Sequence, residues 1–450
     1  MGGGEVALTD GSKTVPSSVR DGVVERALSR ELTLLEAVTL GVGGIIGGGI
    51  YSVLGIVAGV AGPALTVSFF FCTLTALLVG YNYARLGRRF PSCGASYEYV
   101  ARAFPRSELM RVCVGYSLWF GYIVACSFYS VSFGLYASHF FPSFPPRLFS
   151  AALIAFFLVV NVRGVSKAGK VQDTIVLSKV GILIFFVLFA IPSVEVSNYS
   201  PFFPRGFLNV FTASALIFIG YTGFEIISTS GEELKSPERN MGRAIYIAIG
   251  VVSVIYLSVA VIATGIIPYY ELVVSEAPMA ELAKKSLGRW GELILGFGAL
   301  LATSSAYNAA LFGSSRLAYA MSRGGVMPQF FSSLSRVTRA PIFSLVFVSI
   351  PAALVAFFGA LKELSALASL IFLVVFFSVS LSNLRLRRET GANPVFPWLA
   401  MLLCVFFIVF VELVIWLWFI LLTASVVLSY YLRKWLTNRG SVSYKGREDG

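Results

Sequence analysis

The sequence has little of what soluble enzymes use to build active sites. Only 13% of its 450 residues are charged, and it has a single histidine, His139. One histidine excludes a histidine-based metal or acid–base centre, and no nucleophile motif or phosphate-binding loop supports an enzyme or an ATP-driven pump. The five cysteines are scattered without a CxxC pair, which indicates neither a disulfide framework nor a metal site. We therefore expect no cofactor and no metal, and we do not expect an enzyme.

Hydrophobic residues, by contrast, make up 57% of the chain, which is typical of a polytopic helical membrane protein. We predict about 12 transmembrane helices, an even number that puts both termini on the same side. The last two segments are the least certain, because a single kinked or interfacial element would also explain them. The predicted segments are 36–60, 63–84, 110–138, 148–162, 174–192, 209–229, 243–267, 290–316, 342–359, 363–383, 395–411 and 414–431.

The basic residues are distributed unequally between the two sides. Of 35 Lys and Arg, 28 fall on the side of the termini and six on the opposite side, while Lys179 lies inside a span. This asymmetry is the positive-inside bias, so the net charge of +12 indicates membrane topology and no nucleic-acid partner. The first 30 residues lack the apolar core of a signal peptide. We expect a multi-pass protein of the cytoplasmic membrane with both termini in the cytoplasm.

The first span contains a run of glycines that a helix tolerates poorly. Six of the ten residues from Gly41 to Ile50 are glycine, and each costs roughly 1 kcal/mol relative to alanine in a helix. Irregular backbone at membrane depth persists only where protein or a water-filled cavity satisfies it. We interpret the run as a broken helix. A close-packing seam of small residues is the alternative.

A second interruption, Phe218 to Glu225, lies in the sixth span. Because the first and sixth spans each begin a set of five, we predict two halves related by inverted topology. Interrupted helices at matching places in two such halves point to a transport site near the midplane. The predicted organisation is a cytoplasmic tail (1–32), two five-helix repeats (33–193 and 205–385), two additional helices (394–432) and a cytoplasmic tail (433–450).

A helix broken in the membrane exposes backbone groups that suit an amino acid. Free N–H groups and the positive dipole end attract a carboxylate, for which we predict Gly47, Gly48 and Gly49. Free carbonyls suit an ammonium group, and we predict that Ile45, Ile219 and Thr222 supply them. A glycine-lined packing seam remains the rival interpretation of the same residues.

Two ionisable residues lie within or beside these spans. Lys179 either faces the bundle interior, where it could load and release a proton, or extends its ammonium group to the nearby interface. Glu225 could bind a substrate ammonium group, cap the broken helix, or pair with a cytoplasmic arginine.

Several hydroxyl and aromatic residues are candidates for the same region. The hydroxyls of 303–305 could partner Lys179 or a sodium ion, or bond back to their own helix. Candidate pocket walls are Tyr116, Phe120, Tyr221 and Tyr307, although packing is the simpler explanation of each, because aromatic residues are frequent in this chain.

Three connecting segments give weaker signals. Residues 91–99 predict either a re-entrant or interfacial helix or a solvated loop. The segment 268–287 could form a short amphipathic helix that acts as a lid, but a solvated connector is the simpler interpretation. After Tyr430 the basic, polar composition predicts a disordered tail.

The glycine run, read as Gly41 to Tyr51, resembles the first-span signature of the amino acid–polyamine–organocation (APC) superfamily. The segments 91–99, 223–225 with 231–240, and 315–328 match the same superfamily, in family order across about residues 33 to 385. The resemblance is strongest to cationic-amino-acid-type and prokaryotic proton-coupled members.

The resemblance implies an all-α polytopic membrane protein with a five-plus-five inverted repeat and broken first and sixth helices. It also implies a secondary transporter that works by alternating access. In proton-coupled members a lysine on the fifth span stands where sodium-driven relatives bind a cation. Lys179 fits that place, with Gly43, Ser304 and Ser305 around it.

We therefore expect amino acid transport, with a neutral substrate and proton symport favoured. An exchanger of amino acids or amines, a cationic amino acid transporter and a non-transporting sensor remain alternatives. Some exchangers carry a serine among the first-span glycines, where this chain has Gly48. Members that pair with a single-span subunit carry a cysteine in the second outer loop. Residues 139–147 contain none, so no disulfide-linked subunit is expected, and the oligomeric state is open.

Overall fold

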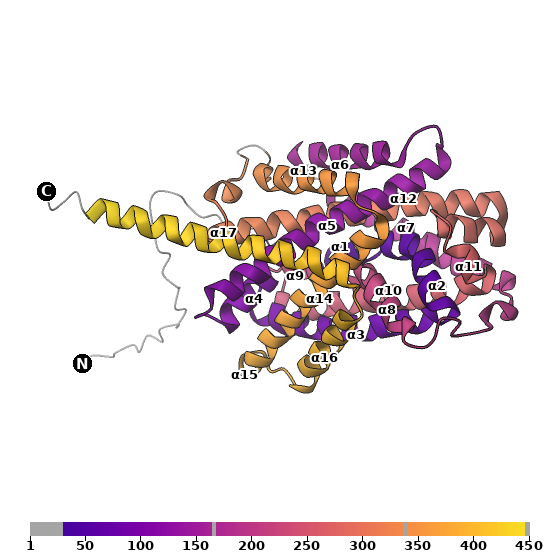
Figure 1. Ribbon diagram of the computed structural model, residues 1–450, viewed down its shortest axis with the longest axis horizontal. Coiled ribbons are helices and arrows are strands. Elements are labelled where there is room, and N and C mark those ends of the chain that lie inside the picture. The colour runs from indigo at the N-terminus through magenta and orange to yellow at the C-terminus, as the bar shows by residue number, and fades with distance from the viewer. Residues whose placement is uncertain (1–29, 164–167, 336–337, 339, 446–450) are drawn as a thin grey trace, which may run out of the picture.

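The computed structural model describes residues 30–163, 168–335, 338 and 340–445, and this part of the chain is almost entirely helical. The long helices run roughly along the longest axis of the molecule, side by side (Figure 1). The helices α4 (Ser96–Ala103) and α15 (Arg387–Thr390) lie toward the left end in that view, and α11 (Tyr269–Leu272) lies at the opposite end.

The order of the helices follows the predicted segments. The first half contains α1 (Leu34–Ile45), η1 (Gly49–Val53), α2 (Leu54–Ala61), η2 (Gly62–Ala64), α3 (Leu65–Arg89), α4, α5 (Glu108–Phe140), α6 (Pro146–Arg163) and α7 (Ala168–Ala190). Short turns η3 (Ile191–Ser193) and η4 (Val196–Tyr199) lead to the second half. That half contains α8 (Asn209–Ile217), η5 (Phe218–Tyr221), α9 (Glu225–Thr229), α10 (Pro237–Ile266), α11, α12 (Pro278–Arg323), η6 (Gln329–Ser332), α13 (Ile342–Phe358) and α14 (Leu361–Arg385). The chain continues with α15, α16 (Val395–Val409) and α17 (Leu413–Lys445).

Membrane crossing is supported by the length and composition of these helices. Within the described residues, nine helical runs are long and apolar enough to span a bilayer, and Ile342–Phe358 and Val395–Val409 are shorter apolar helices. One run, Leu34–Arg89, covers two predicted spans, because the chain turns at Gly62 (φ 65°) between α2 and α3. The fold is therefore a multi-pass helical membrane protein, while the count of twelve crossings stays a prediction.

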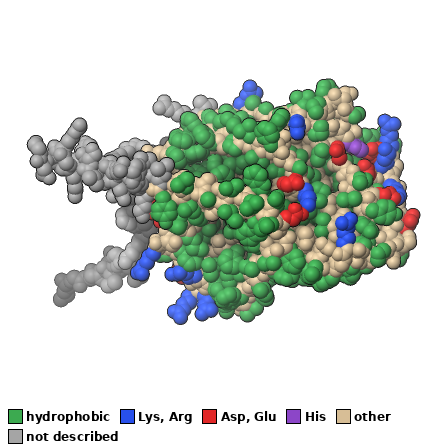
Figure 2. Space-filling model, viewed as in Figure 1, with side chains coloured by type: hydrophobic (Ala, Val, Ile, Leu, Met, Phe, Trp, Pro, Cys, Tyr) green, Lys and Arg blue, Asp and Glu red, His purple; other side chains and the backbone are tan. Residues whose placement is uncertain are grey.

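The surface has the character expected of a protein surrounded by lipid. Large apolar side chains are exposed on the outer helices, for example Phe156 on α6, Leu188 on α7 and Leu421 on α17. Hydrophobic side chains cover most of the face shown in Figure 2. Such an exposed apolar area is unfavourable in water and favourable in hydrocarbon.

The broken first helix begins with a well-defined cap. The Thr33 N–H donates to the Glu36 carboxylate at 2.8 Å, and the Glu36 N–H donates to the Thr33 hydroxyl at 3.3 Å. This capping box satisfies two N–H groups at the helix start. α1 then ends at Ile45, and Ile46 is extended (φ −75°, ψ 95°).

Two of the weaker predictions need correction. Residues 278–287 form the first part of α12, which is kinked at Gly288 (φ 70°). Because Met279 and Leu282 are fully buried there, the solvated connector was wrong and the amphipathic helix is confirmed. The tail after Tyr430 was expected to be disordered, but the backbone of α17 is helical to Lys445.

Two other uncertain segments are now defined. α16 and α17 are separate helices, so the single kinked element is excluded. Residues Ser96–Ala103 form the short helix α4, with Tyr97 and Tyr99 buried, which confirms a helix in place of the solvated loop.

Candidate functional site

The two interrupted helices contact each other at their interruptions. A Cβ atom on Gly49 would lie 2.4 Å from the Cα of Gly220, and one on Gly223 would lie 2.4 Å from the carbonyl carbon of Gly44. Gly223 also has φ 117°, a conformation that L side chains rarely adopt. The glycines thus serve both interpretations of the sequence: they break the helices and they let the two backbones touch.

Lys179 lies beside the first break. The side chain is fully buried, and its Nζ donates to the carbonyls of Gly43 at 2.9 Å and Ile46 at 2.6 Å. A third bond reaches the Ser305 hydroxyl at 2.6 Å. The ammonium group therefore faces the bundle interior, and the interpretation that it extends to the interface was wrong. Within the described residues no hydrogen bond joins Lys179 to Ser304, which is partly exposed and lies next to Ser305 on α12.

The two carbonyls that lie between Gly43 and Ile46 in the chain accept hydrogen bonds from tyrosine hydroxyls. The Tyr129 hydroxyl donates to the Gly44 carbonyl at 3.5 Å, and the Tyr256 hydroxyl donates to the Ile45 carbonyl at 3.0 Å. All four carbonyls at the end of α1, from Gly43 to Ile46, thus have side-chain donors from α5, α7 or α10. The Gly43 carbonyl also accepts from the Ser305 hydroxyl at 3.4 Å, whereas the carbonyls of Gly44 and Ile45 each have one such side-chain donor and a second lone pair.

The carbonyl of Ile219 in the sixth span also has a donor. It accepts from the Thr222 hydroxyl at 2.8 Å and from the Thr222 N–H at 3.2 Å. The Ile219 N–H donates to the hydroxyl of Ser369 at 2.8 Å. Two of the three predicted amine acceptors, the carbonyls of Ile45 and Ile219, therefore already accept hydrogen bonds at the two adjoining breaks.

The predicted carboxylate donors lie at the start of the outer half of the first span. Gly48 precedes η1 and provides no side-chain cap, so the first N–H groups of η1 and α2 have no capping side chain. A Cβ on Gly47 would lie 2.6 Å from the Ala306 Cβ, and one on Gly48 would lie 2.9 Å from the Ser132 Oγ. The residues from Gly47 to Gly49 are all buried.

Glu225 caps the second break. Its carboxylate accepts from the Gly223 N–H at 2.7 Å and from the Tyr122 hydroxyl at 3.4 Å. Within the described residues no cation forms an ion pair with it. The pairing with an arginine occurs instead at Glu233, whose carboxylate lies 2.8 Å from Arg316. The arginine interpretation of Glu225 was therefore wrong, and its position is that of a helix-end carboxylate.

The four predicted wall residues lie in different places. The Tyr221 ring packs against the ring of Tyr256, whose hydroxyl bonds to the Ile45 carbonyl at the first break. The Tyr221 hydroxyl bonds to the Thr73 hydroxyl at 2.9 Å. Tyr307 is buried with its ring against Phe157 of α6.

The other two wall residues are not brought to the breaks. The Tyr116 hydroxyl bonds to the Val326 carbonyl at 3.4 Å. Phe120 lines a groove of about 710 Å³ with α13, α14 and α17. Tyr116 and Phe120 were chosen from a face of α5 that does not meet the first span. The sequence of α5 does not show which face does, because the helix is apolar around most of its circumference.

With this geometry in hand, comparison with known proteins decides the family. A model of the amino acid permease family matches residues 32–435. The chain belongs to the amino acid permease family. It is 29% identical over 445 residues to a branched-chain amino acid permease of Bacillus subtilis, covering 91% of this chain and 94% of that protein.

Two further relatives are named for different substrates. A methylthioribose transporter of Bacillus subtilis is 30% identical over 438 residues, covering 90% of this chain and 94% of that protein. A vacuolar cationic amino acid transporter of Arabidopsis thaliana is 30% identical over 384 residues, covering 80% of this chain and 64% of that protein. Membership of the family therefore leaves the substrate of this permease open.

Sequence reasoning missed several residues that lie at the two breaks. Tyr129, Ser132, Tyr256 and Ser369 all contact one of the breaks, and none was singled out. A spacing along α5 could have revealed part of this set, because Phe128, Tyr129, Ser132 and Tyr136 share one helical face. The Tyr136 hydroxyl continues that face by donating to the Tyr51 carbonyl at 2.5 Å.

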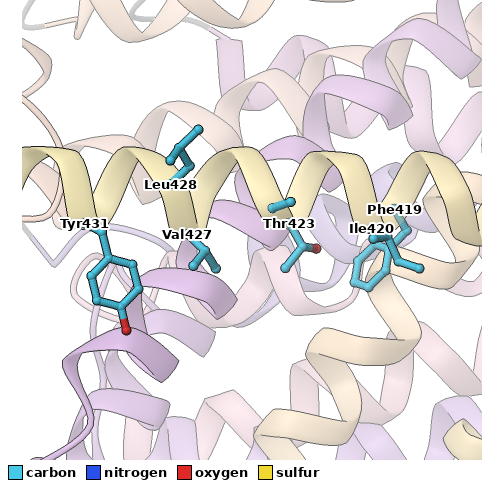
Figure 3. Close-up of a pocket in the computed structure, with 7 residues that line it drawn as sticks. Phe419, Ile420, Thr423, Val427, Leu428 and Tyr431 are labelled. Carbon is cyan, nitrogen blue, oxygen red and sulfur yellow. The ribbon is translucent and has the colours of Figure 1, made fainter.

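The open grooves of the permease lie elsewhere. Figure 3 shows a groove of about 470 Å³ whose labelled side chains, from Phe419 to Tyr431, all project from α17. A groove formed along one outer helix faces the surrounding lipid. We therefore do not associate it with the substrate.

Proposed function

We propose that this permease is a secondary transporter that moves neutral amino acids across the cytoplasmic membrane together with a proton. The substrate would bind at the two breaks, with its carboxylate at Gly47 to Gly49 and its amine near Ile45, Ile219 and Thr222. The side chain would be neutral, because Glu225, the carboxylate beside the breaks, already caps a helix end. Lys179 would carry the coupled proton.

The observation that carries this proposal is the position of the Lys179 ammonium group at the end of α1, beside the first break. In its charged form it offers three donors, which match the Gly43, Ile46 and Ser305 acceptors. A neutral amine has only two N–H groups and is held less strongly. Loss of the proton would therefore release one end of α1 and favour a rearrangement of the break.

The transport cycle would use the two halves of the chain. We propose that residues 33–193 and 205–385 are inverted repeats, with residues 394–432 as two additional helices. Contact between the first and sixth spans at their breaks supports this organisation. Alternating access would then expose the breaks to one side at a time. The 28 to 6 charge asymmetry supports placing both termini, 1–32 and 433–450, in the cytoplasm.

Uptake into proteoliposomes tests the proposal. Purified protein is reconstituted without internal substrate, and labelled leucine uptake is measured with and without an inward proton gradient. We expect the gradient to drive accumulation and Lys179→Ala to abolish the response to it. If uptake requires internal amino acid and ignores the gradient, the protein is an exchanger. If Lys179→Ala retains full gradient-driven uptake, Lys179 has no part in coupling.

Competition decides the substrate. Unlabelled alanine, arginine and methylthioribose are tested against labelled leucine, because the relatives are named for such different substrates. Neutral amino acids should compete best. Strong competition by arginine or methylthioribose alone would contradict the proposed neutral amino acid substrate.

A further inference from the structure

Ser132 on α5 occupies a position that the glycine run leaves without a side chain. Its Oγ lies 2.9 Å from the place where a Cβ on Gly48 would sit, and Ser132 is fully buried. The N–H groups proposed to hold the substrate carboxylate begin at this same residue. A hydroxyl is therefore present beside Gly48, although it comes from another helix.

The hydrogen bonds around Ser132 leave one donor unused. Its hydroxyl bonds to the hydroxyl of Ser52, which is also buried, on η1. Two hydroxyl groups carry two protons, and one hydrogen bond between them uses only one. Within the described residues neither serine forms another bond, so the pair has one O–H available for a further acceptor.

Neighbouring serines on the same helix show the usual alternative. The Ser130 hydroxyl donates to the Ser127 carbonyl at 2.8 Å, and the Ser127 hydroxyl donates to the Ile123 carbonyl at 2.9 Å. Both donate within their own helix, as serines in apolar helices commonly do, and Ser127 also reaches the Ala352 carbonyl of α13 at 3.0 Å. Ser132 differs because its partner is the broken span.

From this geometry we infer that Ser132 donates a hydrogen bond to the substrate carboxylate at Gly48. The inference rests on the proposed function, in which the carboxylate binds at the glycine run. A hydroxyl at this place adds a side-chain donor to the backbone N–H groups and makes the site selective for an acid over its amide. Ser52 is a positioning residue, because it orients the Ser132 hydroxyl through their shared bond.

Three alanine variants separate a donor from a packing residue. Leucine and alanine binding to the purified full-length protein is measured by calorimetry for Ser132→Ala, Ser52→Ala and Ser130→Ala. Ser132→Ala should weaken binding roughly tenfold or more, as expected for loss of a hydrogen bond to a charged group. Ser52→Ala should weaken it by about threefold or less, because Ser132 keeps its hydroxyl. Ser130→Ala is the matched control and should bind as the wild type does.

The outcomes distinguish the inference from the proposed function. Wild-type affinity in Ser132→Ala overturns the inference and leaves the proposed function standing. Equal losses in Ser132→Ala and Ser52→Ala, or in Ser132→Ala and Ser130→Ala, also overturn it, because they indicate a packing role. If the wild type binds neither leucine nor alanine, the proposed neutral substrate itself fails. Ser132→Cys fills the site with a slightly larger side chain whose S–H group is a weak donor, so it should lose affinity even if Ser132→Ala does not fold.

Discussion

The hydroxyl of Tyr256 donates to the carbonyl oxygen of Ile45 at 3.0 Å, directly before the first break. Ile45 is the carbonyl predicted to receive a substrate amine, so this acceptor is already in use. A carbonyl has two lone pairs, and a substrate could share it or take it over. The bond also ties α10 to the end of α1 at the point where the helix stops.

Replacing Tyr256 with phenylalanine should lower the stability of the empty protein. The Ile45 carbonyl would lose its donor, and an unsatisfied buried carbonyl costs about 1–3 kcal/mol. A substrate amine would then satisfy it, so leucine should raise the melting temperature more in Tyr256→Phe than in the wild type. Thermal unfolding in detergent with and without leucine measures both effects.

A matched control for this change is Tyr307→Phe. The Tyr307 ring packs against Phe157, and within the described residues its buried hydroxyl makes no hydrogen bond to a carbonyl of either break, so its loss should not alter the leucine-induced shift. An unchanged shift in Tyr256→Phe would show that the amine does not use the Ile45 carbonyl.

Glycine substitutions should separate binding from folding within the same run. Gly49→Ala places a Cβ 2.4 Å from the backbone of Gly220, where no side chain can move aside, and should cost about 1–3 kcal/mol or more. Gly48→Ala meets only the Ser132 and Phe128 side chains, which can adjust. We therefore expect Gly49→Ala to unfold at a lower temperature, and Gly48→Ala to fold normally but bind leucine weakly.

Gly250 provides the control for these glycine changes. No heavy atom lies within 4 Å of a Cβ at that position in α10, so Gly250→Ala should leave binding and folding intact. If Gly48→Ala unfolds as readily as Gly49→Ala, close packing explains the whole run and the carboxylate site is lost as an interpretation.

The breaks could be predicted from the sequence because glycine has a local effect on a helix. Gly41 to Gly49 and Gly220 to Gly223 weaken their helices whatever surrounds them. What the sequence could not show is that Gly49 meets Gly220 and Gly44 meets Gly223, since that contact joins residues far apart in the chain. The choice between a break and a packing seam was therefore not decidable from composition, and both are present.

Side-chain direction limited the remaining predictions. Lys179 was recognisable as a lysine in an apolar span, but its three acceptors come from α1 and α12. Aromatic residues make up 14% of the chain, so Tyr129 and Tyr256 did not stand out among them. On α5 the wrong face was chosen, because a helix buried or lipid-facing on all sides has no polar face to orient it.

Two adjacent serines on α12 test the coupling role of Lys179. The Ser305 hydroxyl accepts from the Lys179 ammonium group, whereas the neighbouring Ser304 has no hydrogen bond to Lys179 within the described residues. Ser305→Ala removes one acceptor from a buried charge, so the proton should be held less tightly. The pH at which proton-driven leucine uptake is half-maximal should then fall by about one unit, and Ser304→Ala should leave it unchanged. Equal pH profiles for the two variants would argue against a coupling role for the Ser305 contact.

The ion pair between Glu233 and Arg316 should make stability depend on pH. Burial raises the pKa of Glu233 above its ordinary value of 4.5, and the Arg316 charge opposes this effect. A raised pKa means that the folded state binds the proton more tightly than the unfolded state does, so stability falls as pH rises above about 4.5. Arg316→Gln removes the opposing charge and should steepen this fall, whereas Glu233→Gln should remove it. Melting temperatures between about pH 5 and pH 8 measure the slopes. The control is Glu98→Gln, because Glu98 forms a surface ion pair with Arg102 at 3.5 Å. A wild-type slope in Arg316→Gln would contradict the predicted effect of the Arg316 charge.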